Sequence, residues 1–221
     1  MVLCNFFSLD NQNSFYWAGF LAADGCILDK KGPTKIISLA LAKKDKAHIE
    51  KFKDAIAANN PIYDYLIKNS KRNARWNDTW KSEIKITSYK LCEDLVRFNV
   101  VPRKSKIYTF PKWLISHELV NHFMRGYSDG DGSFFFNTAK NKVTKQLYFN
   151  LRGTQGFLEV YRSILEKSCN LKERTKDIRV NNGIGVLEYG GNGVVGDIAK
   201  FFYRGADIYL ERKYEIFLSW R

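Results

Sequence analysis

Apolar and polar residues alternate along several stretches of the chain. Between residues 140 and 152, Val143, Leu147, Phe149 and Leu151 fall on one side, and polar or basic residues fall on the other. A period of two predicts a β-strand that buries one face and turns its polar face outward. Residues 81–87 and 172–176 follow similar patterns. We therefore expect strands with a basic outer face at three places in the chain.

Two largely apolar segments match each other. The first, FYWAGFLAADGCI, begins at Phe15, and the second, HFMRGYSDGDGSF, begins at His122. Each has the composition of a buried helix that ends in a turn, and each is followed by alternating residues and then by a second helical stretch. These second stretches are expected near residues 48–57 and 157–165.

The match between the two parts of the chain extends beyond these segments. Residues 37–41 alternate as residues 147–151 do, and RKSKIY, from Arg103, resembles RKYEIF, from Arg212. Two copies of one unit are too few for a solenoid, so we expect them to face each other across a pseudo-twofold axis. The predicted halves are residues 1–112, with a motif at 17–25, and residues 113–221, with a motif at 124–132.

Small residues recur on one face of each predicted motif helix. Gly19 and Ala23 are four residues apart in the first, as Gly126 and Gly130 are in the second. Small residues at this spacing allow two helix backbones to approach closely. We therefore expect the two helices to pack against each other at the centre of the molecule.

The sequence also predicts how the motif helices begin and end. Ser14 and Ser116 are candidate N-caps, because their hydroxyl groups can accept a bond from the first turn of a helix. Gly25 and Gly132 are expected to end the helices in the left-handed conformation that glycine tolerates.

One acid follows each predicted pair of small residues. Asp24 and Asp131 lie at the C-terminal ends of the motif helices, where the helix dipole disfavours negative charge. Either aspartate alone is better explained as a turn residue before glycine. Two of them at equivalent positions of a duplicated chain favour a functional role. A divalent cation would compensate for two nearby carboxylates, and Mg²⁺ suits carboxylate oxygen and substrate phosphate.

The charge of the chain narrows the possible partners. The 221 residues include 36 Lys and Arg against 23 Asp and Glu, a net charge of +13, divided into +9 for residues 1–112 and +4 for the remainder. A basic strand pair fits the major groove of DNA. The residues expected to contact DNA are Lys30, Lys31, Lys35, Lys68, Arg72, Arg75, Lys81, Lys85, Lys140, Lys142, Gln146, Arg152, Lys172, Arg174, Lys176 and Arg179.

Composition excludes several classes of protein. With 45% hydrophobic and 15% aromatic residues, the chain has enough apolar material for a packed core, which excludes wholesale disorder. No apolar run approaches the length of about 20 residues that a membrane span needs. Four widely separated cysteines, with no CxxC pair, predict reduced thiols in an intracellular protein.

The two motifs, WAGFLAADG at residues 17–25 and MRGYSDGDG at residues 124–132, resemble those of the single-chain LAGLIDADG homing endonucleases. The resemblance implies an α+β fold of two pseudo-symmetric αββαββα repeats. Two antiparallel sheets would form a saddle, with the motif helices at the central interface. It also implies a monomer that makes site-specific double-strand breaks in DNA by metal-dependent phosphodiester hydrolysis, in the context of intron homing. Mg²⁺ would be the cofactor, Mn²⁺ could replace it, and Ca²⁺ could bind without turnover.

The resemblance also implies roles for particular residues. Asp24 and Asp131 would be the metal ligands, joined by the carbonyl groups of Ala23 and Gly130, and Lys104 and Lys213 would assist catalysis. The candidates for orienting solvent are Asp45 in the first half and Thr154 or Gln155 in the second.

Three polar or charged residues of the second motif have apolar counterparts in the first. Asp129 has Ala22 as its counterpart, so we expect it to have a structural role and to rank behind Asp131 as a metal ligand. Arg125 and Ser128 replace residues that are usually apolar, which predicts two unequal interface helices. The sequence leaves a second functional class open, an intron RNA maturase or a non-catalytic DNA-binding protein on the same fold.

Overall fold

The structure is a computed structural model, and it describes residues 2–29, 34–68, 77–137, 145–172 and 178–220. The first part of the chain forms η1 (Phe6–Ser8), α1 (Gln12–Ala23), β1 (Gly25–Asp29), β2 (Lys35–Ala42), η2 (Lys43–Asp45), α2 (Lys46–Ala55), β3 (Ile62–Ile67), β4 (Thr79–Thr87), α3 (Tyr89–Asp94), η3 (Leu95–Phe98) and η4 (Lys104–Lys106). The second part forms η5 (Lys112–Leu114), α4 (Val120–Asp131), β5 (Gly132–Asn137), β6 (Gln146–Gly153), α5 (Gln155–Ser168), β7 (Arg179–Asn181), β8 (Ile184–Gly190), α6 (Asn192–Tyr203) and α7 (Glu211–Trp220).

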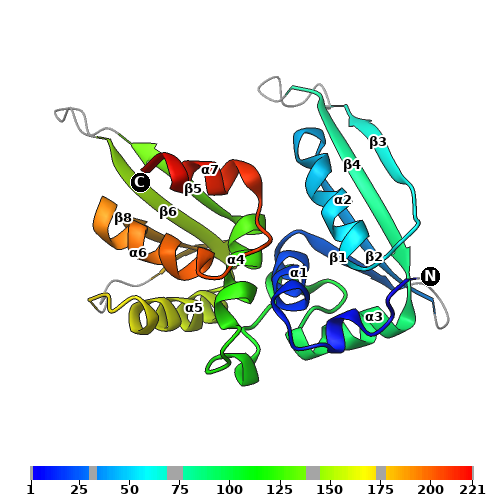
Figure 1. The fold of residues 1–221 in the computed structure, drawn as a ribbon, viewed down its shortest axis with the longest axis horizontal. Coiled ribbons are helices and arrows are strands. Elements are labelled where there is room, and N and C mark those ends of the chain that lie inside the picture. Colours follow the sequence, from blue (N-terminus) through cyan, green and yellow to red (C-terminus); the bar gives the residue numbers. More distant parts are fainter. Residues whose placement is uncertain (1, 30–33, 69–76, 138–144, 173–177, 221) are drawn as a thin grey trace.

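The elements form two four-stranded antiparallel sheets with the same topology. The strand orders are β1-β2-β4-β3 and β5-β6-β8-β7. Each sheet belongs to one αββαββα unit, and α7 follows the second unit. The two sheets lie on either side of the central helices α1 and α4, and together they form a saddle (Figure 1). The predicted α+β architecture is confirmed.

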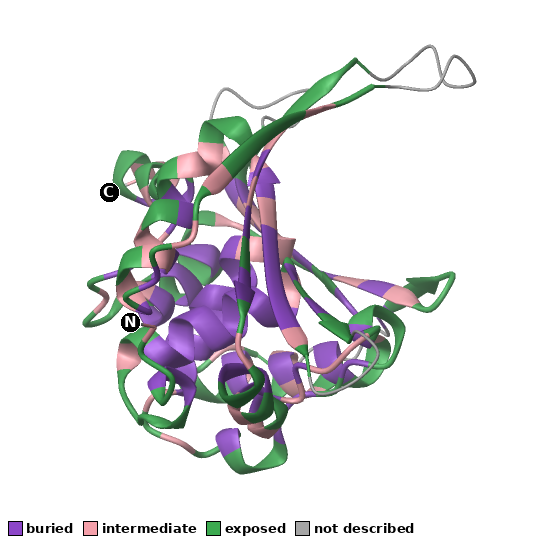
Figure 2. Ribbon diagram, turned by 90° about the vertical axis from the view of Figure 1, so that its right-hand side faces the viewer, coloured by how far each residue is buried: buried purple, intermediate pink, exposed green. Residues whose placement is uncertain are grey.

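Each sheet buries one face against helices and leaves the other face open. In the first sheet the side chains of Leu39, Ile84 and Ile86 are buried against the helical layer, and in the second those of Leu147 and Phe149 are buried. The helices lie on one side of the molecule and the curved strands on the other (Figure 2). We call the side of both sheets that faces away from the helices the open face.

Two of the three predicted basic strands are present. The alternating segment at residues 81–87 lies in β4, and β6 starts at Gln146 and contains the described part of the segment that ends at Arg152. The third segment, residues 172–176, lies outside the described residues except for Lys172, which is in an irregular segment after α5; strand β7 begins at Arg179.

Strand register corrects the alignment of the two repeats. Gly25 pairs with Leu39 in the first sheet, and Gly132 pairs with Leu151 in the second. Leu151 is therefore the equivalent of Leu39, whereas the sequence comparison aligned it with Leu41. Alternation alone permits a slip of two residues, because such a slip keeps every side chain on the same face.

Helices α1 and α4 pack with backbone against backbone. A β-carbon built on Gly19 would lie 2.1 Å from the carbonyl oxygen of Phe123, and one built on Gly126 would lie 1.9 Å from the carbonyl oxygen of Tyr16. These two contacts are reciprocal, since each glycine meets the residue three positions before the other. Only glycine allows such an approach, and the expected close packing of the motif helices is therefore present.

The ends of the motif helices differ from the sequence-based expectation. Asn11, not Ser14, caps α1, because its side chain accepts a hydrogen bond of 2.9 Å from the amide of Ser14. Helix α4 follows Leu119 without a side-chain cap. Gly25 and Gly132 do not have the predicted positive φ and instead begin strands β1 and β5. Glycine is required at residue 25 for steric reasons, since a β-carbon there would lie 2.7 Å from the carbonyl oxygen of Leu21.

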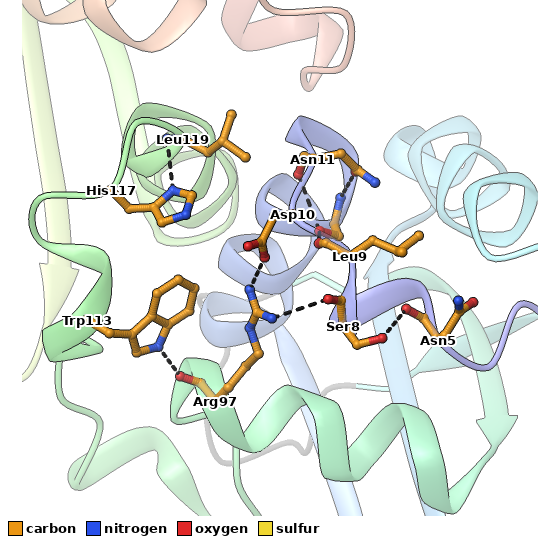
Figure 3. A network of polar contacts seen from close by, with 10 residues as sticks. Asn5, Ser8, Leu9, Asp10, Asn11, Arg97, Trp113, His117 and Leu119 are labelled. Atoms are coloured by element: carbon orange, nitrogen blue, oxygen red, sulfur yellow. Dashed lines mark hydrogen bonds and ion pairs between the residues drawn. The ribbon is translucent and has the colours of Figure 1, made fainter.

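The segment that links the two units, which includes Trp113, forms polar and cation–π contacts with the first unit. The side chain of Arg97 forms an ion pair with Asp10, and its backbone carbonyl accepts a 2.7 Å hydrogen bond from Nε1 of Trp113 (Figure 3). The guanidinium group lies 4.6 Å from the ring centroid of Trp113. Nδ1 of His117 accepts a hydrogen bond from the amide of Leu119 just before α4 begins. The predicted boundary between residues 112 and 113 falls within η5.

The start of α7 connects the second unit to the first. Arg212 donates to both carboxylate oxygens of Asp45, at 3.0 and 3.2 Å. Lys51 of α2 forms an ion pair with Glu211, and its ammonium lies 5.6 Å from the ring centroid of Tyr209. These contacts fix the N-terminal end of α7 against α2. None of the helices in the described part of the chain has the length and apolarity needed to cross a membrane.

Candidate active site

The two motif acids lie side by side where α1 and α4 end. Asp24 is the C-cap of α1, and Asp131 is the last residue of α4. The position that a β-carbon would take on Gly130 lies 2.4 Å from Cβ of Ala23 and 3.5 Å from Oδ2 of Asp24. The absence of a side chain at Gly130 therefore allows the helix ends to meet, and this contact brings one carboxylate from each repeat to the pseudo-twofold axis.

The surroundings of this acid pair penalise its negative charge. Burial, together with the charge of the neighbouring Asp24, raises the pKa of Asp131 to about 6, although Lys104 and Lys213 act against this rise. Burial likewise raises the pKa of Asp24, and the charges of Lys213 and Lys104 act in the opposite direction. Desolvation and like-charge repulsion together make two ionised carboxylates costly at this position.

Two buried lysines flank the acid pair in equivalent ways. Nζ of Lys104 donates a 2.6 Å hydrogen bond to the carbonyl of Gly25, and Nζ of Lys213 donates one of 2.6 Å to the carbonyl of Gly132. Both carbonyl groups belong to the glycine that follows a motif acid. Burial lowers the pKa of Lys104, and it lowers that of Lys213 to about 8. The matched RK elements of the sequence thus place one ammonium group beside each acid.

The second lysine is held more firmly than the first. Lys213 also donates to the carbonyl groups of Ser128, at 2.8 Å, and Asp129, at 2.5 Å. Three carbonyl oxygens satisfy the three donors of an ammonium group. The two halves of the site are therefore similar in layout but unequal in detail.

Two further cations lie near the acids on the open face. Lys81 of β4 is among the charges that lower the pKa of Asp24, and Arg152 of β6 is among those that lower the pKa of Asp131. Arg152 is exposed and Lys81 is half-buried. Both are among the residues expected to contact DNA, and the structure places them near the acid pair.

The three residues proposed to orient solvent all have structural partners. Both oxygens of Asp45 accept from Arg212, as described above. Oγ1 of Thr154 caps α5 by accepting from the amide of Phe157, and it donates to the carbonyl of Tyr108 at 2.5 Å. The amide of Gln155 donates to Glu159 in the next turn, at 2.8 Å. The three side chains therefore have structural roles: Thr154 and Gln155 form bonds at the start of α5, and Asp45 forms a contact between the two repeats.

A buried polar network that the sequence did not reveal crosses the helix interface. The hydroxyl of Tyr16 donates to Oδ2 of Asp129 at 2.8 Å and lies 2.8 Å from Nε2 of His48. Because a hydroxyl has one hydrogen to donate, Nε2 of His48 is assigned as the donor in the second bond. Burial lowers the pKa of His48 to about 3, which keeps this imidazole neutral. Oδ2 of Asp129 also accepts from the amide of Leu210 at 2.9 Å.

These contacts agree with the structural role expected for Asp129. Its carboxylate joins α1, α4 and the segment that leads into α7, and burial raises its pKa. Arg125, which is completely buried, donates from Nε to the carbonyl of Ile208 at 2.9 Å and lies 5.1 Å from the ring centroid of Tyr16. No sequence signal points to His48 or Tyr16, since both look like ordinary helix residues.

Apart from Lys35, the residues predicted to contact DNA divide into three groups. The strand faces place one group on the open face, namely Lys81, Lys85, Gln146, Arg152 and Arg179. Among the others, Lys68 and Lys172 are exposed after β3 and α5. Eight lie outside the described residues, namely Lys30, Lys31, Arg72, Arg75, Lys140, Lys142, Arg174 and Lys176.

The assignment of Lys35 to the DNA-contacting face is wrong. Its ammonium lies 5.2 Å from the ring centroid of Tyr89 in α3, which is on the helical side of the first sheet. Lys35 shares its face of β2 with the buried residues Ile37 and Leu39. A positive charge in the sequence does not by itself reveal whether its side chain lies on the helix-covered face or on the open face of a strand.

Comparison with solved structures identifies the fold. The LAGLIDADG meganuclease I-AabMI, solved bound to uncleaved DNA, superposes on this chain with a TM-score of 0.59 and 14% sequence identity. The match covers 95% of this chain and 89% of the I-AabMI chain. I-CpaMI bound to uncleaved DNA matches 96% of the chain over 90% of its own, with a TM-score of 0.58 and 14% identity. The chain has the fold of the LAGLIDADG meganucleases. No protein-family model and no curated protein matches the sequence.

The acid pair of this LAGLIDADG fold suits a divalent cation. The donor set offers two carboxylates whose pKa values are raised chiefly by burial, and a cation bound between them would stabilise their ionised form. Within the described residues, no group of three or more His, Cys, Asp or Glu side chains is arranged to hold a metal. A site with two carboxylates fits Mg²⁺, which retains several waters, better than a metal that requires a full set of protein ligands.

The acid pair predicts how the stability of the metal-free protein depends on pH. The pKa of Asp131 is about 6 in the folded state and about 3.9 in an unfolded chain. The folded state therefore binds the extra proton in this interval, and Asp131 lowers the free energy of unfolding as pH rises from about 4 to about 6. Relative to wild type, Asp131→Asn should stabilise the metal-free protein at pH 7.5 by about 1–2 kcal/mol, after allowance for partial solvent screening.

Urea denaturation in EDTA at pH 4.5 and pH 7.5 would measure this difference. Comparison of wild type with the variant cancels the opposite effect of His48 and His122, whose lowered pKa values destabilise the protein in acid. Asp54→Asn, at an exposed position near the end of α2, is the control and should change stability little. An Asp131→Asn protein that is less stable than wild type at pH 7.5 would contradict the electrostatic account of the site.

Proposed function

We propose that this chain is a site-specific homing endonuclease that makes double-strand breaks in DNA. The observation that carries the proposal is the pair Asp24 and Asp131, which the two repeats bring together at the centre of a saddle whose open face is basic. A separate observation points to the same chemistry. I-SmaMI, another structural neighbour, was solved bound to an uncleaved DNA target in the presence of calcium ions, with 15% identity and a TM-score of 0.57.

The two carboxylates would hold the cofactor, together with the carbonyl groups of Ala23 and Gly130. We propose Mg²⁺, with Mn²⁺ as a replacement and Ca²⁺ as an ion that binds without turnover. When bound, the ion would activate water for attack on phosphorus and would stabilise the charge on the leaving oxygen. The residues of the chain would provide the geometry in which one site serves both strands, because one acid and one lysine come from each repeat.

The lysines would support this chemistry by their position and charge. Lys104 and Lys213 are fixed to the carbonyls of Gly25 and Gly132, so each ammonium stays beside an acid. Lys104 would hold attacking water, and both ammonium groups would help to neutralise a phosphate oxygen through their charge, since carbonyl groups take up the three donors of Lys213. A pKa of about 8 leaves Lys213 mostly protonated at neutral pH, although its proton is less tightly held than in water. Arg152 and Lys81 would contact the phosphates next to the scissile bonds.

Double-stranded DNA is the proposed partner, and the protein would act as a monomer. One chain already contains both repeats and both acids, so a complete site needs no second copy. The open faces of the two sheets would lie along the major groove, where lysine, arginine and amide side chains contact phosphates and base edges. We further propose that the protein acts inside the cell, wherever its target DNA lies, and that it serves intron homing.

A cleavage selection tests this proposal. Circular DNA that carries a randomised segment is incubated with the protein in Mg²⁺, in Ca²⁺ and in EDTA, and linear products are sequenced. We expect cutting at one family of related sequences in Mg²⁺ only. The same DNA in a binding selection should yield the same sequences in Ca²⁺. Sequence-specific binding without cutting in any metal would instead support a non-catalytic DNA-binding protein, and preferential binding of folded RNA would support a maturase.

A further inference from the structure

Lys213 lies in the first turn of α7, and the residue before this helix sets its position. The backbone amides of Lys213 and Tyr214 donate to the carbonyl of Leu210, at 3.0 and 3.2 Å. Leu210 is therefore the residue from which α7 starts, and its side chain is buried. A displacement of Leu210 would move the first turn of α7, and with it the ammonium group beside the acid pair.

Asp129 of α4 holds Leu210 in place. Its Oδ2 accepts a 2.9 Å hydrogen bond from the amide of Leu210. Amides at the start of a helix have no partner within the helix, and negative charge is favourable there. The backbone carbonyl of Asp129 also accepts from Nζ of Lys213, at 2.5 Å. One residue thus contacts both the lysine and the residue that begins the helix of that lysine.

The carboxylate of Asp129 is itself fixed from the other motif helix. The hydroxyl of Tyr16 in α1 donates to Oδ2 at 2.8 Å, and Nε2 of His48 in α2 lies 2.8 Å from that hydroxyl. All three side chains are buried, where a polar group that loses its partner is costly. A chain of contacts therefore runs from α2 through α1 to Asp129, and from there to the start of α7.

Arg125, one turn before Asp129 in α4, holds the same part of the chain. Its Nε donates to the carbonyl of Ile208 at 2.9 Å, and its Nη1 donates to the carbonyl of Phe202 at 2.8 Å. Phe202 lies near the end of α6, and Ile208 lies between α6 and α7. Two buried side chains of α4 thus hold the segment that leads into α7.

The equivalent positions of the first repeat are apolar. Ala22 of α1 corresponds to Asp129. Ala18, one turn earlier, corresponds to Arg125. A methyl group can neither donate nor accept a hydrogen bond. Lys104, the counterpart of Lys213, lies in the short helix η4. The two lysines therefore occupy similar places but are positioned by different parts of the chain.

We propose that Asp129 is a positioning residue for the cleavage of one strand of the target DNA. Its carboxylate fixes the start of α7 and so keeps the ammonium of Lys213 in place beside the acid pair. Tyr16 and His48 keep the carboxylate in place. The two lysines come from opposite repeats, so each serves one strand, and the strand served by Lys104 does not depend on Asp129. The inference rests on the proposed function.

The rate of cutting in each strand tests the proposal. The selected target carries a different fluorescent label on each strand and is cut in Mg²⁺ with protein in excess, and denaturing gels follow both strands. Lys104→Ala and Lys213→Ala identify which strand depends on which lysine. Asp129→Ala should slow the strand that depends on Lys213 by about 10²-fold, the loss that a misplacement of about 1 Å can cause, and should slow the other strand little. Binding to the target in Ca²⁺ should persist.

Three further variants separate positioning from a general loss of structure. Asp129→Asn retains an oxygen that can accept from Leu210, so it should restore most of the rate in the slowed strand. Tyr16→Phe removes one hydroxyl and should slow the same strand, although Tyr16 belongs to the first repeat. Gly126→Ala is the control, because its β-carbon would lie 1.9 Å from the backbone oxygen of Tyr16 and would disturb both motif helices. It should slow both strands alike.

The outcomes separate this inference from the proposed function. A loss confined to the strand that depends on Lys213 supports the inference, whether it is seen in Asp129→Ala or, if circular dichroism shows that variant to be unfolded, in Tyr16→Phe. Equal losses in both strands, no loss in either, or a loss confined to the other strand would overturn it and leave the endonuclease proposal intact. Lysine variants that each slow both strands equally would also overturn it. If no duplex is cut in any metal, the proposed function fails, and this inference fails with it.

Discussion

Asp24→Asn and Asp131→Asn are each expected to reduce double-strand cleavage by about 10³-fold or more, while DNA binding persists. Each variant removes one of the two carboxylates that would hold the metal, and the stabilisation that a catalytic cation supplies amounts to several kcal/mol. Binding should persist because the side chains that we expect to contact DNA, such as Lys85, Gln146 and Arg179, are spread along the strands of the open face and are unchanged in these variants. It should even become slightly tighter, since a negative charge facing phosphate is removed.

Cleavage of a plasmid that carries the selected target would measure this effect, and a gel-shift assay in Ca²⁺ would measure binding. Asp54→Asn, on the exposed side of α2, is the matched control and should cut as wild type does. A large loss of cleavage together with an equal loss of binding would indicate a structural defect. Normal cleavage by either site variant would exclude that aspartate from the mechanism.

Gly126→Ala is expected to lower the free energy of unfolding by about 3 kcal/mol or more, which is at the upper end of the effects of overpacking. The new β-carbon would lie 1.9 Å from the carbonyl oxygen of Tyr16, which is backbone and cannot rotate away. The clash can be relieved only if α1 and α4 separate. Because the ends of these helices hold Asp24 and Asp131, separation would also spread the acid pair and lower cleavage in the fraction that stays folded.

Gly156→Ala provides the matched control for this prediction. Gly156 lies in α5, and a β-carbon there would have no atom within 4 Å, so the change should stabilise the protein by about 0.5–1 kcal/mol. Urea denaturation of both variants, followed by cleavage assays on the folded proteins, would test the pair of expectations. A Gly126→Ala protein as stable as wild type would show that the helices do not pack as closely as described.

Local signals explain most of what could be predicted about the fold. Strand β4 was found because Ile84 and Ile86 alternate with polar residues, a pattern that depends only on neighbours in sequence. The motif helices were found because two matched segments reinforce each other. Which residues of β2 and β6 are equivalent could not be read from alternation, since a shift of two residues keeps the same face buried. The cap of α1 was assigned to Ser14 in place of Asn11, because both residues have the chemistry of a cap.

The candidate site was predictable only in part for a similar reason. Asp24 and Asp131 stand out because they are repeated, whereas Lys104 and Lys213 follow from the resemblance to the LAGLIDADG homing endonucleases. Asp45 is a candidate for orienting solvent in the active site, but in the structure its carboxylate forms an ion pair with Arg212, which is distant in sequence. The partners of a charged side chain depend on which elements are brought together, and the pattern around it does not reveal them.

The sequence by itself determined the duplication, the type and approximate place of most elements, and the two acids, because periodicity, small residues and repetition are recorded in the order of residues. Only the tertiary structure decided that Lys35 faces a helix, that Tyr16, His48 and Asp129 share a buried network, and that Lys104 and Lys213 are bonded to the carbonyl groups of Gly25 and Gly132. Each of these features depends on which side of a strand or helix meets a distant neighbour. That choice is made by packing of the whole chain, when burial of apolar surface fixes which faces are covered.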